Sequence, residues 1–218
     1  MSEQPIQAVL LIGMPGVGKG TQGKLLGRIP GLFHLSTGEI FRALRDDTDD
    51  GRLVANCLSR GQLVPDALTI EIWTHWLNAQ IQSQSFRPAE QLLLLDGIPR
   101  NLSQCQCLAP HLEVLQVIYL NPPIDEPIVQ RLRQRALIEG RADDADESII
   151  RNRFEVYRRE TAPILQSYRR ELIHEIDPMG SSAEVLKRIL MVLMPVIAAT
   201  RGVICESDDF TVSSHESQ

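Results

Sequence analysis

Residues 13–22 hold the side chains whose types and spacing point most directly to a chemistry. They read Gly-Met-Pro-Gly-Val-Gly-Lys-Gly-Thr-Gln and follow directly on the apolar run 8–12. A glycine-rich turn between a buried strand and a helix directs successive backbone N–H groups at one point, and Lys19 adds an ammonium group there. The sequence therefore predicts a phosphate-binding loop rather than an ordinary glycine-rich turn. Gly20 stands where the pattern G-x-x-x-x-G-K-[ST] asks for serine or threonine, and Thr21 follows it.

A second candidate segment, 96–100, reads Asp-Gly-Ile-Pro-Arg and follows four consecutive leucines. In a doubly wound sheet, ligands bind at the carboxyl ends of the strands, where this segment and the glycine loop both emerge. The carboxylate of Asp96 can hold the water shell of a nucleotide-bound Mg²⁺, and Arg100 can grip a phosphate with two N–H groups. The alternative is a strand-ending turn with a capping Asp96 and a solvated Arg100.

Two further clusters carry polar side chains. One combines Ser-Thr-Gly-Glu-Ile-Phe-Arg at 36–42 with Gly-Gln-Leu-Val-Pro-Asp at 61–66. The other is dense in arginine and contains Arg131, Arg133, Arg135, Arg141, Arg151 and Arg153. Either cluster can be a solvated charged face, but several fixed cations beside a phosphate loop are what phosphoryl transfer requires.

Apolar runs alternate with helical patterns and indicate the elements that position these residues. Strands are predicted at 8–12, 33–35, 92–95, 115–120 and 172–176, and helices at 21–28, 38–45, 52–59, 66–83, 103–111, 125–137, 146–169 and 182–199. Strands that are apolar on both faces are typical of a parallel sheet covered by helices. Asp66 is a predicted N-cap, and Ile70, Trp73 and Leu77 then share one helical face. We expect Trp73 and Trp76 to pack in the core.

The composition limits what the protein can bind. The 218 residues, 43% of them hydrophobic, fit one α/β domain at 1–206, followed by a polar tail at 207–218 that we expect to be disordered. A net charge of −6 provides no overall basic field for a nucleic acid. No apolar run approaches the roughly 20 residues that span a bilayer, and the N-terminus lacks the pattern of a signal peptide. We therefore expect a cytoplasmic protein without nucleic-acid or membrane partners, whose four scattered cysteines are reduced thiols.

Taken in order, these motifs resemble those of the adenylate kinase family of nucleoside monophosphate kinases. The resemblance runs from about residue 8 to about residue 190 and so covers most of the chain. Residues 13–22 resemble the family's GxPGxGKGTQ, residues 36–42 resemble STGDLLR, and residues 96–104 resemble DGFPRTLAQ. The stretch 131–157 resembles the family's short lid and the helix after it.

This resemblance implies a fold and a reaction. The fold would be of the P-loop NTPase type, a doubly wound, five-stranded parallel sheet with helices on both faces. Two insertions would be mobile, one binding the monophosphate at about 36–65 and one short lid at about 132–144. The reaction would be ATP + AMP ⇌ 2 ADP with Mg²⁺, carried out by a monomer. The lid lacks the four metal ligands of long-lid relatives, so no structural zinc is expected.

The resemblance also implies roles for individual residues. The donor ATP would contact Gly16, Val17, Gly18, Lys19, Gly20, Thr21, Arg131 and Gly180, with Arg131 stacked on its adenine. The acceptor AMP would contact Thr37, Arg42, Leu63, Val64, Gly97, Arg100 and Gln104, with the two arginines on its phosphate. The moving phosphoryl group would be stabilised by Lys19, Arg100, Arg135, Arg141 and Arg153. Thr21 and Asp96 would organise the metal ion directly or through water.

Three positions bear on the choice of acceptor. Thr37 and Gln104 resemble the adenine-accepting members, whereas pyrimidine-accepting members tend to have alanine and asparagine there. Asn101 follows Arg100 at a position where adenylate kinases usually have threonine. At this position the chain resembles the pyrimidine-accepting members. A UMP/CMP kinase, a P-loop enzyme that phosphorylates a non-nucleotide alcohol, and a non-catalytic nucleotide sensor remain the alternatives.

The register of the arginine-bearing helix stays open. The segment between Asp144 and Arg153 is one residue longer than the family pattern. Counting back from Tyr157 assigns the second helix arginine to Arg153, whereas counting forward from Arg141 lands on Asn152. One added residue rotates later helix positions by about 100°. Arg153 is therefore favoured, and Arg151 remains an alternative.

Overall fold

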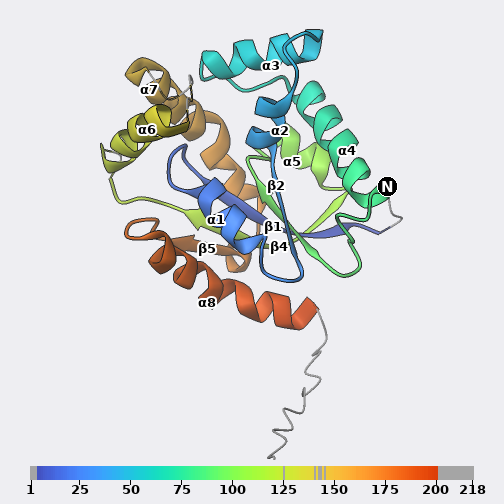
Figure 1. Cartoon of the computed structure of the whole chain (residues 1–218). Coiled ribbons are helices and arrows are strands. Elements are labelled where there is room, and N and C mark those ends of the chain that lie inside the picture. The colour runs from blue at the N-terminus through green and yellow to red at the C-terminus, as the bar shows by residue number, and fades with distance from the viewer. Residues whose placement is uncertain (1–3, 125, 140, 142–143, 145, 201–218) are drawn as a thin grey trace, which may run out of the picture.

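Five strands form one parallel sheet at the centre of the computed structural model, in the order β2-β3-β1-β4-β5 (Figure 1). The structure describes residues 4–124, 126–139, 141, 144 and 146–200. The strands are β1 (Ile6–Gly13), β2 (Leu32–Ser36), β3 (Leu92–Asp96), β4 (Leu112–Leu120) and β5 (Ile173–Ile176). All five predicted strands are present, which confirms the five-stranded parallel sheet. The largest difference is that β4 begins three residues earlier than the apolar run suggested.

Helices cover both faces of the sheet because alternate residues of the strands are buried on opposite sides. Val9 and Leu11 of β1 belong to one core, which includes side chains of α1 (Lys19–Leu26), α6 (Glu126–Glu139), α7 (Glu147–Val156) and α8 (Ser182–Thr200). Ala8 and Leu10 belong to the other, which includes side chains of α4 (Asp66–Gln82) and α5 (Leu102–Leu108). A central strand that is apolar on both sides can be stable only between two such layers.

A small third core lies apart from the sheet, among α2 (Thr37–Ala43), α3 (Asp49–Ser59) and the start of α4. Phe41, Val54, Cys57 and Val64 are its buried members. In Figure 1, α2 and α3 stand beyond the edge of the sheet. This arrangement gives residues 37–64 apolar contacts of their own and lets them form one side of the site described below.

Helix α4 has the predicted apolar face but not the predicted cap. Trp73 and Leu77 are buried in the core, and Ile70 and Trp76 pack against it. The predicted N-cap at Asp66 is wrong, because Pro65 is the capping position and Asp66 is the first helical residue. Proline has no N–H to lose at a helix start, and its φ suits the turn. The side chain of Asp66 is therefore directed to other partners.

The predicted long helix at 146–169 is interrupted. Regular α-helix α7 ends at Val156, a π-helical turn follows at Tyr157–Thr161, and a 3₁₀ turn occupies Ala162–Ser167. Pro163 lacks an N–H and its ring clashes with the carbonyl four residues earlier, so a regular helix cannot continue through it. The π turn sets the direction of Tyr157 and Thr161, which both face the cavity described below. Helical periodicity alone did not reveal this change.

Several sequence predictions concern residues outside the described part of the chain. The predicted disordered tail at 207–218, the thiol of Cys205, the first residues of the N-terminus and residues 140 and 142–143 of the predicted lid are among them. Of the helices that the structure describes, none has the length and apolar character needed to cross a membrane.

Candidate active site

A cavity of about 720 Å³ opens at the carboxyl edge of the sheet. Its walls come from the loop between β1 and α1, the segment after β3, and α2, α6 and α7. Both Lys19 and Arg100 line it, so the two strongest sequence motifs meet in one space. The loop residues Gly16, Val17, Gly18, Gly20 and Thr21 line the same cavity. These placements leave room for phosphate groups between two sets of basic side chains.

Glycine is required at two positions of the loop. Gly16 has φ +88°, and a Cβ there would lie 2.7 Å from Cγ of Leu132 in α6. Gly18 has φ +99° and is the residue before the first turn of α1. Both φ values lie in the left-handed region that other residues rarely adopt. The loop can therefore turn sharply under α6 and present its backbone N–H groups to the cavity.

Lys19 is held inside the loop by two backbone carbonyls. Its Nζ donates to the O atoms of Gly13 (2.6 Å) and Met14 (3.0 Å). Burial lowers the pKa of Lys19 to about 8, with Asp96 opposing the shift and Arg100 adding to it. At neutral pH most of the lysine is still protonated, and an anion bound beside it would favour the charged form further.

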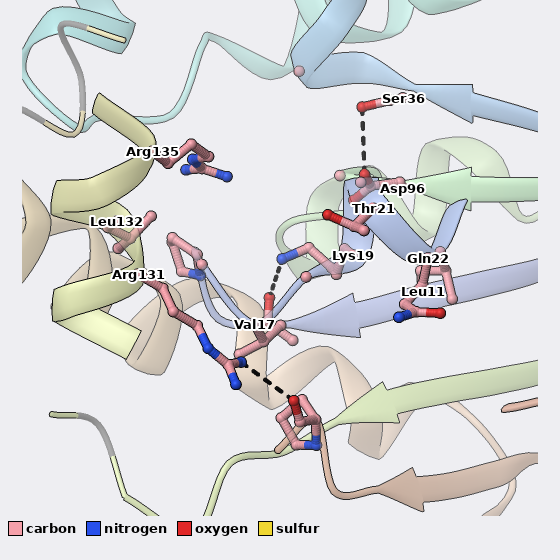
Figure 2. A pocket seen from close by; sticks show the side chains of 18 of the residues that line it. Leu11, Val17, Lys19, Thr21, Gln22, Ser36, Asp96, Arg131, Leu132 and Arg135 are labelled. Atoms are coloured by element: carbon pink, nitrogen blue, oxygen red, sulfur yellow. Dashed lines mark hydrogen bonds between the residues drawn. The ribbon is translucent and has the colours of Figure 1, made fainter. Parts of the chain in front are cut away.

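Asp96 provides a buried carboxylate at the end of β3. Its Oδ2 accepts a hydrogen bond from Ser36 Oγ at 3.4 Å and lies 4.0 Å from Nε2 of His34 (Figure 2). Burial lowers the pKa of His34, and Asp96 opposes this shift. Asp96 and Thr21 both line the cavity and offer oxygen atoms, the ligands that Mg²⁺ prefers. Across the part of the chain that is described, no group of three or more His, Cys, Asp and Glu side chains could hold a metal ion by itself.

Three arginines on the opposite wall converge on one carboxylate, Asp144. Arg135 Nε donates to Asp144 Oδ2 at 2.7 Å, Arg141 Nε lies 3.4 Å from the same oxygen, and Arg153 Nη1 bonds to Oδ1. Asp144 has no solvent exposure, and its negative charge is balanced by these three cations. Burial and Arg141 lower the pKa of Arg135, and Asp144 opposes this shift. Sequence reasoning gave Asp144 no role, although an acidic residue in an arginine-rich stretch was the available signal.

The structure places Arg153, not Arg151, at the cavity. Arg153 lines it with a side chain that is 16% exposed. Arg151 bonds to Glu147 one helical turn away, and its side chain is 58% exposed. The turn before α7 ends with Asp146 as the N-cap, which fixes this rotation of the helix. The register that sequence counting favoured is therefore the one that brings an arginine inward.

Arg131 reaches the cavity from α6, one helical turn before Arg135. Its Nη1 donates to the carbonyl of Pro178 at 3.2 Å (Figure 2), and Gly180 also lines the cavity. In the same view, Arg131 and Arg135 extend from α6 on the side of the loop away from Asp96. Arg131 and Gly180 therefore line the same cavity as the predicted donor-binding loop.

The predicted acceptor residues divide into two groups. Those that line the cavity are Arg42, Leu63, Gly97 and Arg100. The other three, Thr37, Val64 and Gln104, are buried and adjoin residues that line it. Thr37 Oγ1 donates to the carbonyl of Asp96, and Gln104 is engaged by Arg100, Asn101 and Asp66. Sequence reasoning did not foresee the partnership of Gln104 with Asp66, because the two residues are 38 positions apart.

Comparison with known proteins identifies relatives over most of the chain. The family model described as adenylate kinase matches residues 11–173. The chain is 42% identical over 207 residues to the adenylate kinase of Clavibacter michiganensis subsp. michiganensis, covering 92% of this chain and 96% of that protein. It is 38% identical over 192 residues to the adenylate kinase of Flavobacterium psychrophilum, covering 85% and 97%. The adenylate kinase of Leifsonia xyli subsp. xyli is 40% identical over 202 residues, covering 90% and 95%.

Proposed function

Because this chain belongs to the adenylate kinase family, we propose that it transfers a phosphoryl group from ATP to AMP and gives two molecules of ADP. The observation that carries the proposal is the single cavity lined by both the glycine loop with Lys19 and the arginines Arg42 and Arg100. Two phosphorylated ligands that enter such a cavity from different sides would meet phosphate to phosphate. The arginines gathered by Asp144 would stand beside that junction.

The donor phosphates would lie on the loop. Backbone N–H groups of residues 16–21 and the ammonium of Lys19 would bind the β- and γ-phosphates, since the start of α1 favours an anion. Arg131 would lie against the donor base, with Gly180 beside it. These residues would fix the leaving oxygen and the phosphorus atom in position.

The acceptor phosphate would be held by Arg42 and Arg100. Arg100 is oriented for this by the backbone of the preceding turn, because its Nε donates to the carbonyl of Gly97 at 2.8 Å. The backbone carbonyl of Arg100 accepts a hydrogen bond from Thr161 Oγ1 at 2.8 Å. Holding the acceptor oxygen in line with the donor phosphorus accounts for much of the rate of such reactions.

The transfer itself needs charge stabilisation rather than a base. A phosphate oxygen is already ionised at neutral pH, so no proton has to be removed from the acceptor. Negative charge spreads over the moving phosphoryl group, and Lys19, Arg100, Arg135, Arg141 and Arg153 would stabilise it. Closure of the insertions at about 36–65 and 132–144 would exclude water, which would otherwise compete as acceptor.

The oxygen ligands in the cavity fit Mg²⁺. Asp96 and Thr21 would hold the ion, directly or through its water shell, and Ser36 would orient the carboxylate. When bound with ATP, the ion would neutralise charge on the phosphates. The proposal includes no structural zinc.

AMP is the favoured acceptor. Thr37 and Gln104 match the adenine-accepting members of the family, and the relatives reported above carry the name adenylate kinase. A UMP/CMP kinase is the alternative that Asn101 keeps in view. Arg42, Arg100 and Lys19 are all at the cavity, which does not favour a nucleotide sensor that has lost its phosphate contacts.

One coupled assay tests the function. Purified protein is given Mg-ATP with AMP, UMP, CMP or GMP in separate reactions, and ADP formation is followed. We expect AMP to have the highest kcat/KM. A higher value with UMP or CMP would replace the proposal with a pyrimidine kinase, and no turnover with any acceptor would reject it.

We further propose that the enzyme works as a cytoplasmic monomer on free nucleotides, with no nucleic-acid or membrane partner. The glycine loop with Lys19 and the pair Arg42 and Arg100 already meet within one chain, as a monomeric enzyme would require. The thiol of Cys105 lies 3.7 Å from the hydroxyl of Tyr168 as a free cysteine, which suits a reducing compartment. Light scattering coupled to size exclusion measures the mass in solution, and cell fractionation measures the location.

A further inference from the structure

The side-chain amide of Gln104 is buried and held at both ends. The residue is only 1% exposed. Its Oε1 accepts the backbone N–H of Arg100 at 2.7 Å, and its Nε2 donates to Oδ1 of Asp66 at 2.8 Å. The two partners come from different parts of the fold, the segment before α5 and the first turn of α4.

These two partners allow only one orientation of the amide. A backbone N–H can only donate, and an ionised carboxylate can only accept. Rotating the Gln104 amide by half a turn would place its NH₂ against the N–H of Arg100 and its oxygen against the carboxylate of Asp66. Each of these contacts is repulsive and leaves a buried polar group unpaired. The observed orientation leaves one acceptor position on Oε1 and one N–H on Nε2 for a ligand.

Asn101 completes the arrangement. Its Nδ2 donates to the same Oδ1 of Asp66 at 2.8 Å, and its Oδ1 accepts the backbone N–H of Gln104 at 2.8 Å as the N-cap of α5. Asp66, Asn101 and Gln104 thus form a closed set of hydrogen bonds. Asn101 fixes the position of the carboxylate, and the carboxylate fixes the amide.

We propose that Asp66 and Asn101 are positioning residues that set the acceptor base by holding the Gln104 amide in one donor–acceptor orientation. The inference rests on the proposed function, in which Gln104 reads the acceptor base. Adenine and cytosine present an amino group beside a ring nitrogen that accepts. Uracil and guanine present a carbonyl beside a ring N–H, which is the reverse pattern. A fixed Gln104 therefore pairs with the first pattern and opposes the second.

The decisive variant is Asp66→Ala, which removes the acceptor of both amides. We expect the kcat/KM ratios of AMP to UMP and of AMP to GMP to fall by about 10-fold, while the ratio of AMP to CMP changes by less than about twofold. The KM for ATP should stay unchanged, since Asp66 bonds to Asn101 and Gln104 on the acceptor side of the site. A loosened fold would lower all acceptors together and would not separate CMP from UMP.

The conservative variant Asp66→Asn distinguishes the hydrogen bond from the charge. Asparagine keeps an acceptor oxygen at the same place but removes the negative charge from the first turn of α4. We expect Asp66→Asn to keep the ratios of the unmodified protein. Asp49→Ala is the matched control, because Asp49 is also an acidic residue in the first turn of a helix and bonds only to Arg52 among its recorded partners. It should leave every ratio unchanged.

A second pair of variants keeps the test decisive if Asp66→Ala does not fold. Asn101→Asp keeps the cap on Gln104 but places a carboxylate against Asp66, so the ratios of AMP to UMP and to GMP should fall. Asn101→Ala removes the donor to the same Oδ1 without adding a charge, so it should lower the two ratios by less.

The outcomes separate this inference from the function on which it rests. If the unmodified protein phosphorylates AMP and neither Asp66→Ala nor Asn101→Asp changes the base ratios, the inference is wrong and the function stands. Equal losses for all four acceptors would also overturn it. If the unmodified protein does not use AMP, both fail together.

Discussion

Lys19 is held by the carbonyls of the glycine loop and supplies a positive charge to the cavity. We predict that Lys19→Met lowers kcat/KM by at least about 100-fold, the loss typical of removing one fixed donor to the transition state. The fold should survive, because the ammonium of Lys19 donates its hydrogen bonds to two carbonyls of the same loop. Steady-state kinetics and thermal unfolding measure the two effects. Lys187→Met, on the exposed side of α8, is the control that should change neither.

The two neighbouring arginines of α7 should differ sharply in their effect on the rate. We predict that Arg153→Ala lowers the rate at least about 100-fold, because it removes a cation at the cavity. Arg151→Ala should cost little, since that side chain is exposed and bonds to Glu147. Single-turnover rates with saturating nucleotides compare them. A larger loss from Arg151→Ala would show that the inward arginine has been misassigned.

The sequence alone revealed the site residues that belong to local motifs. Lys19, Asp96 and Arg100 could be recognised because each lies within a few positions of a glycine or proline that fixes the backbone. The roles of Asp144 and Asp66 could not, because each depends on side chains from other elements. Whether a carboxylate is solvated or collects three arginines is decided by tertiary packing, which spacing along the chain does not record.

Helices and strands were predicted well where one hydrophobic periodicity runs through the whole element. The prediction failed where the helix type changes within a segment. The buried strand β3 follows from four consecutive leucines, since a run that short and apolar has to lie inside a covered sheet. In contrast, the α-helix ends at Val156, a π turn follows to Thr161, and a 3₁₀ turn follows to Ser167. Proline explains why a regular helix cannot continue through Pro163, but no local sequence pattern marks the π turn at Tyr157–Thr161.

Helix α3 provides a test in which packing and helix propensity predict opposite signs. Alanine normally stabilises a helix by roughly 1 kcal/mol relative to glycine. At Gly51, however, a Cβ would lie 1.8 Å from the carbonyl oxygen of Arg45 and 2.9 Å from Oγ1 of the capping Thr48. We predict that Gly51→Ala lowers the free energy of unfolding by about 1–3 kcal/mol, because the turn before the helix must move.

Urea unfolding at equilibrium measures this change. Asn56→Ala is the matched control, because Asn56 is exposed on the same helix and alanine there should stabilise slightly. If both alanines stabilise the protein, the turn at 45–48 relaxes freely and the contact at Gly51 carries no energy.

The whole molecule separates its charges in space. The net charge is −6, yet among the described residues nine basic side chains line the cavity against two acidic ones, Glu39 and Asp96. The basic residues are Lys19, Lys24, Arg28, Arg42, Arg100, Arg131, Arg135, Arg141 and Arg153. A concave site with walls of low polarisability concentrates the field of its own charges. A nucleotide near the opening should therefore experience attraction, although the molecule as a whole is negative.

This separation gives the salt dependence a predictable sign. If the net charge governed binding, added salt would screen repulsion and raise kcat/KM for AMP. We predict the opposite, a fall of about 3- to 10-fold as the ionic strength increases from about 0.05 to about 0.5 M, because the screening length decreases below about 10 Å over that range. Potassium acetate and sodium chloride at equal ionic strength should give the same curve, since screening does not depend on the anion. The remote variant Arg169→Gln should keep the slope, because its side chain is exposed and pairs with Glu171. A rate that rises with salt would mean that the outer surface, not the arginine-lined cavity, controls how nucleotides approach.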